Sequence, residues 1–491
     1  MSTPVAKNTL YLTVASVAQK ALAFFYFLLL ARVMRPEATG DYFLALSITA
    51  IFSTVSDLGV TPVVIRDVAK FPERAADLIR RALWLKVPFM ALATVGAIAM
   101  SWALGYDSTV RELVLIASLV MLADAVSLLF YGVLRGNHAL RFESLGIFVG
   151  QTCTLLFGGL VLMTRPSLHL LVLVLLAGST FNALFSARRV VSIYGWSILR
   201  PRFDEKAIRT LLIAAIPFAL AGIFVKVYSF VDSIIISKII GTAAVGVYAV
   251  AYKFTYAFQF LPMAFVAALY PGMSAMVGKK DTDGLTRLFD DAIWYMTILA
   301  APIAFGLWAV AGDAIALAGD GYVDAAPVLA TLIFVLIPIF LDFPVGSLLN
   351  AANRQATKTA VMGATMVINV ICNLLLIPAF GLLGAAYSAV ISFVFLFGAG
   401  FWFIPKVIPN YGIDRLLRTV VPIVFSAAAM GIATRLIRPY SGFYPVLPIA
   451  VVLYVGMLAL TRSIRTQHLA SASRLIRRKF SYAKEDEAVH D

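Results

Sequence analysis

Apolar runs of membrane-spanning length recur along the whole 491-residue sequence, and charged residues are concentrated between them. The runs do not alternate apolar with polar residues, and each is about 20 residues long, enough for a helix to cross roughly 30 Å of hydrocarbon. Because 61% of the residues are hydrophobic and only 13% are charged, a water-soluble core could not hide this apolar surface. Backbone groups in lipid must bond within the chain. The sequence therefore predicts an all-α integral membrane protein.

We expect about fourteen transmembrane helices, and an even number places both termini on the same side of the membrane. Most of the 40 lysines and arginines fall in the loops and the tail on that side. The positive-inside rule then predicts that both termini are cytoplasmic, in a cell membrane, and it accounts for the net charge of +14 without a nucleic-acid partner. The expected spans lie near residues 8–33, 41–65, 82–105, 112–134, 144–164, 168–187, 210–237, 243–277, 292–318, 325–349, 359–380, 382–404, 419–437 and 444–461.

The connections between spans are too short for a soluble catalytic domain, the largest being residues 188–209. Cys153 and Cys372 lie within apolar runs, and the four histidines are scattered, so we expect no metal, disulfide or cofactor. No GxxxxGK[ST] nucleotide loop occurs. The tail after Thr461 admits two readings: an interfacial amphipathic helix, or a basic segment that only sets topology. The helix would share one face among Leu469, Ala472, Ile476 and Phe480.

Two stretches of the sequence resemble each other and indicate an internal repeat. The stretch from Ala15 reads "ASVAQKALAFFYFLLLARVMRPEATGDYFLA", and the stretch from Ala221 reads "AGIFVKVYSFVDSIIISKIIGTAAVGVYAVA". At one constant spacing they share a lysine, a glycine and a tyrosine as well as apolar residues. A second match pairs Asn137 with Asn353. Both copies begin on the same side, so the repeat is parallel, and two such bundles with a cleft between them suit alternating access.

The repeat predicts the organisation of the chain into four parts. Residues 1–205 form an N-terminal six-helix lobe, and residues 206–405 form a C-terminal six-helix lobe. Residues 406–461 add two transmembrane helices, and residues 462–491 form a basic cytoplasmic tail.

Ionisable residues inside spans are costly, and they are functional candidates by default. Lys20 and Lys226 occupy equivalent positions in the two copies, so both could line a shared cleft and attract an anionic group such as a phosphate. Lys253 and Tyr256 share a helix face, and we include them in the same pathway. Lys86, nearer the cytoplasmic end of its span, is interpreted as an interfacial anchor.

Three aspartates inside spans are candidates for coupling a proton or a sodium ion: Asp57, Asp124 and Asp232. The alternative is that each caps a helix or pairs with a neighbouring helix. Asn369 and Asn373, four residues apart, are expected to bond between helices.

Several segments, in this order, resemble the polysaccharide-biosynthesis (oligosaccharide flippase) family of the multidrug/oligosaccharidyl-lipid/polysaccharide exporter superfamily. They are "LARVMRPEATGDYFLALSI", "SDLGVTPVVIRDVAK", "GVYAVAYKF", "LYPGMSAM" and "NLLLIPAFGLLGAAYSAVIS", and the match covers roughly residues 8–405. The resemblance implies two pseudo-symmetric six-helix bundles around a V-shaped central cavity. It also implies movement of a polyprenyl-diphosphate-linked glycan from the cytoplasmic to the outer leaflet.

The resemblance implies roles and partners as well. Basic residues of the central cavity would meet the diphosphate and the glycan, and Lys20, Lys226 and Lys253 are the positions available here. Arg32 and Lys238 would guard the outer mouth. The implied partners are the lipid-linked glycan, membrane lipids and polysaccharide polymerase machinery.

Three rival functions stay open. The first is a multidrug or cation antiporter of the same superfamily, in which acidic rather than basic residues should dominate the cavity. The second is a lipid II flippase, which also has fourteen spans. The third is a membrane-embedded glycosyltransferase or polymerase, although the long outer loop or carboxylate-rich loop usual for that class is not present. A transporter without enzymatic activity is therefore preferred.

Overall fold

The computed structural model describes residues 3–200 and 203–464, and this part of the chain is helical throughout, with no strand. The tail residues named above, from Leu469 to Phe480, lie outside the described residues. The α-helices are α1 Thr3–Val33, α2 Pro36–Asp57, α3 Val60–Lys70, α4 Ala75–Ala103, α5 Ser108–Gly136, α6 Leu140–Thr164, α7 Leu168–Tyr194, α8 Glu205–Ile239, α9 Thr242–Tyr256, α10 Phe260–Lys279, α11 Thr282–Ala309, α12 Ala311–Ala316, α13 Ala325–Leu332, α14 Leu336–Ala351, α15 Gln355–Phe380, α16 Leu382–Phe401, α17 Ile413–Ser441 and α18 Phe443–Leu460. Short 3-10 helices are η1 Pro72–Arg74, η2 Trp196–Leu199, η3 Ala257–Gln259, η4 Asp320–Tyr322, η5 Ile333–Val335 and η6 Ile404–Lys406.

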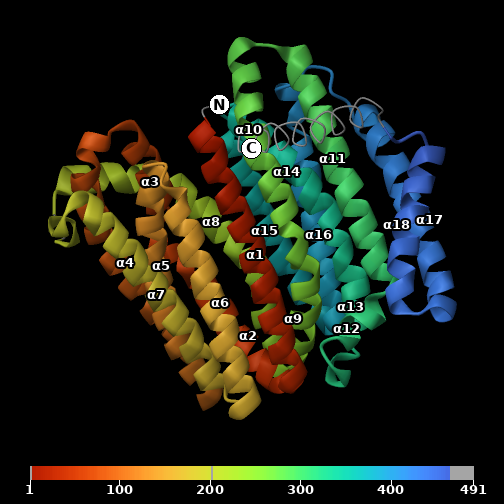
Figure 1. Ribbon diagram of the computed structural model, residues 1–491, viewed down its shortest axis with the longest axis horizontal. Coiled ribbons are helices and arrows are strands. Elements are labelled where there is room, and N and C mark those ends of the chain that lie inside the picture. The colour runs from red at the N-terminus through yellow and green to blue at the C-terminus, as the bar shows by residue number, and fades with distance from the viewer. Residues whose placement is uncertain (1–2, 201–202, 465–491) are drawn as a thin grey trace, which may run out of the picture.

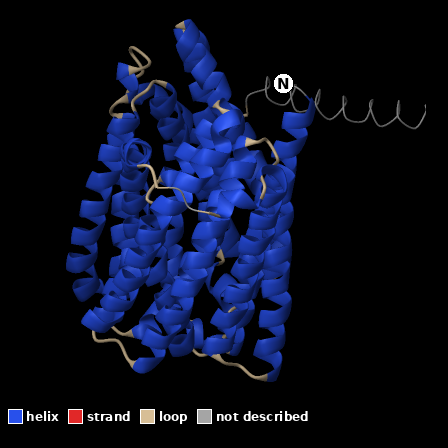
Figure 2. Ribbon diagram, turned by 90° about the vertical axis from the view of Figure 1, so that its left-hand side faces the viewer, coloured by secondary structure: helices blue, strands red, loops and turns tan. Residues whose placement is uncertain are grey.

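The long helices run roughly along one direction, as a stack of membrane-spanning segments should (Figure 2). Helices α3 to α7 gather on one side of the molecule, α9 to α16 gather on the other, and α1 runs between them (Figure 1). Helices α17 and α18 lie at the outer edge of the second group. Thirteen segments in the described part of the chain are long and apolar enough to cross a membrane. The expected class, an all-α multi-pass membrane protein, is confirmed.

The second predicted span, 41–65, is not one continuous helix. Helix α2 ends at Asp57, and α3 begins at Val60, because Leu58 and Gly59 adopt left-handed backbone angles, with φ of 45° and 69°. Glycine tolerates this region without a steric cost. A β-carbon at Gly59 would lie 2.5 Å from the carbonyl oxygen of Ala215 in α8, so the break also requires a residue without a side chain.

The eighth predicted span, 243–277, is the expected span that is missing from the thirteen segments. Helices α9 and α10 are separated there by the 3-10 turn η3, Ala257–Gln259. The tenth predicted span, 325–349, is interrupted in the same way by η5 between α13 and α14, although it counts among the thirteen. The expected long connection 188–209 is much shorter in the structure, because α7 extends to Tyr194, η2 follows, and α8 begins at Glu205. Hydropathy identifies only the apolar part of a helix, so it does not detect that the helix continues into polar residues at its end.

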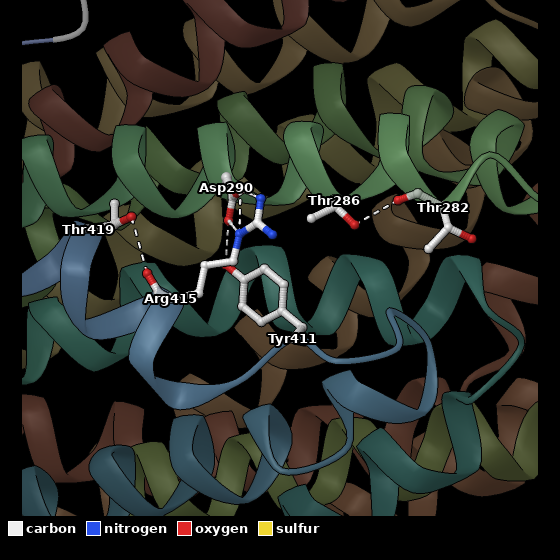
Figure 3. Close-up of polar contacts among 6 residues, drawn as sticks. All are labelled: Thr282, Thr286, Asp290, Tyr411, Arg415 and Thr419. Atoms are coloured by element: carbon white, nitrogen blue, oxygen red, sulfur yellow. Dashed lines mark hydrogen bonds and ion pairs between the residues drawn. The ribbon is translucent and has the colours of Figure 1, made fainter.

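Helices α17 and α18 are attached to the rest of the protein through α11, along which α17 packs. Buried Asp290 on α11 accepts a hydrogen bond of 2.7 Å from the Tyr411 hydroxyl. The Arg415 guanidinium binds both oxygens of the same carboxylate, with Nε 3.1 Å from Oδ1 and Nη2 2.5 Å from Oδ2 (Figure 3). Bidentate arginine–carboxylate pairs are stronger and more directional than neutral hydrogen bonds. This cluster therefore fixes where the extra helices begin.

Contacts at one end of the molecule join the helices on the two sides, and two glycines make the tightest of them. A β-carbon at Gly40 in α2 would lie 1.8 Å from the carbonyl oxygen of Thr242, and one at Gly246 in α9 would lie 2.0 Å from that of Pro36. Each glycine thus packs on the backbone that begins the other's helix. The Thr39 hydroxyl lies 2.7 Å from the Tyr322 hydroxyl beside them. Small residues permit such close helix approach in membranes.

Replacing either glycine by alanine should therefore force α2 and α9 apart at this end. We expect a thiol placed at the fully buried Thr39 position of a cysteine-free variant to react several-fold faster with a membrane-impermeant maleimide when Gly246→Ala is added. Gly398→Ala in α16 is the matched control, because a β-carbon there has no neighbour within 4 Å. Equal labelling with and without Gly246→Ala would contradict a role for the glycine contact in closing this end.

Candidate functional site

Lys86 and Asp57 form an ion pair inside the helical group α2 to α7. The Lys86 Nζ atom lies 2.6 Å from Asp57 Oδ1, and only 2% of the Lys86 side chain is exposed. Asp57 also accepts hydrogen bonds from the backbone N–H (3.4 Å) and the hydroxyl of Thr61, so it links the end of α2 to the first turn of α3. The interpretation of Lys86 as an interfacial anchor is therefore wrong: the side chain turns inward to a carboxylate and does not reach the interface.

Two more ion pairs lie near the same end of the helices. Arg135 on α5 donates from Nε to Glu143 Oε2 at 2.7 Å, and Lys358 Nζ lies 2.5 Å from Asp342 Oδ1. Sequence reasoning had treated Arg135, Glu143 and Lys358 as loop residues, because the apolar runs begin or end just beside them. One feature of the sequence could have indicated these pairs: each of the three residues lies directly beside an apolar run and close to a turn that contains asparagine.

Three lysines in the interior remain without an ion-pair partner among the described residues: Lys20 on α1, Lys226 on α8 and Lys253 on α9. The charge of Lys20 acts on both of the others, so the three lie in one neighbourhood. Lys20 is exposed, whereas Lys226 and Lys253 are half-buried. The structure thus brings together the three cations that the sequence proposed for one pathway.

Aromatic rings provide part of the surroundings of the half-buried lysines. Lys253 Nζ lies 5.2 Å from the ring centre of Phe27 and 5.5 Å from that of Phe43, and Lys226 Nζ lies 5.4 Å from that of Phe230. Ring faces attract cations without neutralising them. The rings therefore contribute to holding the ammonium groups of Lys226 and Lys253 in place.

The other predicted site residues are used in different ways. Asp232 is buried and accepts a 2.5 Å hydrogen bond from the Tyr248 hydroxyl and a 2.8 Å bond from the Ser233 backbone N–H. The Tyr256 ring stacks on Tyr252 with 4.2 Å between ring centres. Asp232 and Tyr256 therefore belong to a packed tyrosine cluster, and neither lines the two cavities described below.

Arg32 and Lys238 lie at the ends of α1 and α8, at the end of the molecule that the two glycines close. Arg32 is exposed. Lys238 donates to the backbone carbonyl of Leu104, and its Nζ lies 4.0 Å from the ring centre of Tyr106, so α8 is tied here to the turn between α4 and α5. Asn369 bonds between helices as expected: its Nδ2 donates to the Ser392 hydroxyl at 3.2 Å, and its backbone carbonyl accepts from the Ser388 hydroxyl, both on α16. Asn373 instead donates to Asn369 Oδ1 within α15, at 3.1 Å.

A cavity of about 750 Å³ lies among α1, α2, α3, α5, α6, α7 and α8; we refer to it as the N-terminal cavity. It contains two predicted ion-coupling aspartates and one of the three lysines. Its polar lining residues are Gln19, Ser53, Thr54, Ser56, Asp57, Asp124, Ser127, Tyr131, Arg135, Glu143, Gln151, Thr154, Ser179, Asn182 and Lys226. Its size falls in the range of small-molecule sites.

A second cavity of about 400 Å³, the C-terminal cavity, lies among α8, α10, α14, α15 and α16. It contains the pair Asp342–Lys358. The remaining residues that line it are Val225, Tyr228, Ser229, Gln259, Val266, Ile339, Phe343, Gly346, Ser347, Asn350, Met362, Phe393 and Leu396. Lys20, Lys253 and Tyr256 line neither of these two cavities.

The two cavities occupy corresponding places in the repeat. The turn between α5 and α6 has a counterpart in the turn between α14 and α15: the residue with positive φ is His138 in the first and Asn353 in the second, and the flanking helices end and begin equally far from it. This shifts the Asn137–Asn353 pairing predicted from the sequence by one residue. In this register, lining residues correspond as Asp124 with Ile339, Ser127 with Asp342, Leu128 with Phe343, Tyr131 with Gly346, Arg135 with Asn350, Glu143 with Lys358, and Ile147 with Met362.

In the two copies of this turn, the same position carries opposite charges: Glu143 in the first copy and Lys358 in the second. Each finds its partner on the preceding helix of its own group, Arg135 in one case and Asp342 in the other. An ion pair across this turn is thus present in both copies, with its polarity reversed.

Comparison with known proteins gives the chain its relatives. The sequence pattern of the polysaccharide biosynthesis protein family matches residues 5–277, and the MatE pattern matches residues 217–375. Among curated proteins, a probable flippase, AglR, from Haloferax volcanii is 28% identical over 240 residues, which are 46% of this chain and 48% of that protein. The chain thus spans about half the length of this relative.

Two further relatives align over more of their length. A probable low-salt glycan biosynthesis flippase, Agl15, also from Haloferax volcanii, is 21% identical over 392 residues, which are 79% of this chain and 81% of that protein. The succinoglycan biosynthesis transport protein ExoT from Rhizobium meliloti is 22% identical over 311 residues, 62% of this chain and 60% of that protein.

Solved structures share the fold. The lipid II flippase MurJ in an inward closed conformation has a TM-score of 0.70 at 14% identity, and the alignment covers 94% of this chain and 99% of that one. A multidrug resistance MATE family transporter in an inward-facing conformation has a TM-score of 0.67 at 14% identity, covering 82% of this chain and 96% of that one. At this identity the likeness establishes the architecture alone.

The Lys86–Asp57 pair leads to a stability prediction. Lys86→Met leaves a buried carboxylate without its cation, which costs about 3–5 kcal/mol in buried pairs of this kind. We expect a clear fall in the melting temperature of the purified protein for Lys86→Met. The double variant Asp57→Asn, Lys86→Met should recover part of the loss, because no isolated charge remains. Arg66→Met, in an exposed pair with Asp67, is the control and should change little. Equal melting temperatures for Lys86→Met and Arg66→Met would contradict the structural importance of the buried pair.

Proposed function

The chain belongs to the polysaccharide biosynthesis protein family, and from that premise we propose that it is a flippase for a polyprenyl-diphosphate-linked glycan. It would move this precursor from the cytoplasmic to the outer leaflet by alternating access, as a transporter without a chemical step. Polysaccharide polymerase machinery would then use the product. The names of the relatives support a glycan carried on a membrane lipid.

The observation that carries the proposal is the contrast between paired and unpaired charges inside the protein. The ion pairs of Lys86, Arg135 and Lys358 are each complete, whereas Lys20, Lys226 and Lys253 have no such partner within residues 3–200 and 203–464. A diphosphate brings at least two negative charges, and unpaired burial of such charges is prohibitive. A neighbourhood of free ammonium groups offsets that cost. A bulky cationic drug would be repelled there, which counts against the multidrug antiporter.

The proposed cycle uses the closed end of the molecule. In the predicted orientation the glycine contact between α2 and α9 lies on the outer side, and the N-terminal cavity extends from mid-membrane toward the cytoplasmic side, where Arg135 and Glu143 lie. The head group would enter from the cytoplasm, and the polyprenyl tail would stay in lipid. An inside-negative potential favours outward movement of negative charge by about 2.3 kcal/mol per charge per 100 mV.

The transporter returns to its starting conformation without a bound diphosphate. We propose that a proton or a sodium ion binds during this return step. Asp124 is the best placed of the three candidate aspartates, because it lines the N-terminal cavity and its charge acts on Lys226. Asp57 already has Lys86, and Asp232 is bonded to Tyr248. A lipid II flippase remains the second candidate function, since it too would carry a polyprenyl diphosphate.

We predict that Lys20→Ala and Lys226→Ala each lower glycan export without removing the protein from the membrane. Loss of one charge-assisted hydrogen bond should reduce the rate by about 10- to 100-fold. Lys20→Arg and Lys226→Arg keep the charge and should be milder. The measurement is surface glycan in cells carrying each variant, with membrane abundance determined in parallel. Lys279→Ala, at the last residue of α10, is the control. Normal export by the Lys20→Ala, Lys226→Ala double variant would remove these lysines from the mechanism.

The orientation is tested separately by reporter fusions. The turn between α10 and α11 lies at the opposite end of the molecule from α12 (Figure 1). We expect an alkaline phosphatase fusion at Gly319 to be active and one at Lys279 to be inactive, with a green fluorescent protein giving the reverse pattern. Fusions that place both positions on one side would show that the proposed topology is wrong.

A further inference from the structure

The repeat supplies an internal comparison for the N-terminal cavity. Where this cavity presents Asp124, the C-terminal cavity presents Ile339. By the spacing that aligns the starts of α7 and α16, Asn182 corresponds to Leu396. The same scaffold is therefore built with apolar residues at these places in its second copy. Polar groups inside a membrane protein are costly, and the second copy builds the same scaffold without them at these places, which points to contact with a ligand or a transported group.

The same contrast holds on two other helices. Gln19 on α1 corresponds to Val225 on α8, in the spacing that also aligns Gly40 with Gly246. Gln151 on α6 corresponds to Met366 on α15, in the register of the two turns. The C-terminal cavity has polar lining of its own, for example Ser229, Gln259 and Ser347. At these four positions, however, the first copy is polar and the second is apolar.

Part of the polar wall is held rigidly in place. The Tyr131 hydroxyl donates a 2.7 Å hydrogen bond to Asn182 Oδ1, and Asn182 Nδ2 donates a 3.1 Å bond to the carbonyl of Gly178. Two glycines of α6 leave the room for this: a β-carbon at Gly146 would lie 1.9 Å from the Tyr131 hydroxyl, and one at Gly150 would lie 2.4 Å from Asn182 Nδ2. A wall with fixed side chains is the usual support of a specific site.

Two amide groups of the cavity are free to bind, because the side chains of Gln19 and Gln151 make no hydrogen bond to any described residue. The Asp124 carboxylate is exposed to the cavity, beside the Ser179 hydroxyl that bonds with it and the charge of Lys226. Amides offer both donors and acceptors, and a carboxylate accepts from two hydroxyls at once. This combination suits an uncharged ligand rich in hydroxyl groups. The charged pairs at the edge, Asp57 with Lys86 and Arg135 with Glu143, cancel in net charge.

We propose that the N-terminal cavity binds the sugar next to the diphosphate of the transported lipid, through Gln19, Asp124 and Gln151. This inference rests on the proposed function. Lys226 lies in the wall of the cavity and close to Lys20, so a diphosphate held by these lysines stands at the cavity's edge. The first sugar, bonded to that diphosphate, then enters the cavity. The C-terminal cavity, with its apolar counterparts, takes no sugar. Recognition of the glycan is therefore asymmetric, although the scaffold is repeated.

The test compares two probes on the purified full-length protein in lipid nanodiscs. One is the polyprenyl-diphosphate-linked glycan fraction extracted from membranes of the source cells, and the other is undecaprenyl diphosphate without sugar. The variants Gln19→Val and Gln151→Met install the residue that the second half carries at the corresponding position. We expect each to weaken binding of the glycan lipid about tenfold, the size of effect seen when a polar ligand contact is lost. Binding of undecaprenyl diphosphate should stay within about twofold, which also shows that the variants are folded.

Two controls separate this inference from the proposed function. Lys226→Ala should weaken both probes, and Ile339→Val in the C-terminal cavity should weaken neither. If Gln19→Val, Gln151→Met and their combination bind the glycan lipid as tightly as the unchanged protein, the cavity is not the sugar site, while the flippase function stands. Equal affinity of the unchanged protein for both probes would overturn the sugar site in the same way. If the unchanged protein binds neither probe, both the sugar site and the diphosphate function are wrong.

Discussion

A charged side chain in the middle of a bilayer costs about 2.5–3.5 kcal/mol on insertion scales unless a partner or water compensates it, and this cost governs where charge is placed in the protein. Three basic residues meet it by pairing: Lys86 with Asp57, Arg135 with Glu143, and Lys358 with Asp342. These pairs join neighbouring helices or the two helices of one turn, so they stabilise the scaffold. Against this background, the lysines without an ion-pair partner among the described residues are the ones to which the proposed function assigns a transported anion.

The repeated scaffold also shows how function diverges without a change of fold. Gly40 and Gly246 make the same contact with each other's helix, and both copies carry an ion pair across the turn after their fourth helix. The glycine packing is therefore symmetric between the two copies, and the ion pair across the turn is present in both with its charges reversed. The lining of the cavities differs at particular positions, since Gln19 and Asp124 of the first cavity correspond to Val225 and Ile339 of the second. The proposed ligand, a lipid-linked glycan, has one end unlike the other and therefore requires an asymmetric site.

Helix interruptions supply the places where such a scaffold can change shape. The break at Leu58 and Gly59 lies against α8 near its internal Pro217, and Asp57 bonds across it to α3. The 3-10 turn η3 divides the corresponding helix of the second copy. Discontinuous helices that line a cavity are a common device of membrane transporters, because their free backbone groups are satisfied by side chains and neighbouring helices.

The sequence by itself determined the class of the protein, the number of spans to within one, and the neighbourhood of Lys20, Lys226 and Lys253. It could do so because hydropathy over twenty residues is a local property, and because a lysine within such a run is visible without a structure. The sequence did not predict which side chains pair with one another, because a local pattern does not identify a partner on another helix. Hydropathy places Lys86 at the end of a span and predicts an anchor, because the sequence does not show that Asp57 on another helix faces it. It places Glu143 and Lys358 in loops, because their helices extend past the apolar runs. Only the tertiary structure decided which charges pair, which stay free, and that the larger polar cavity belongs to one copy of the repeat, because each of these depends on the distance between residues far apart in the chain.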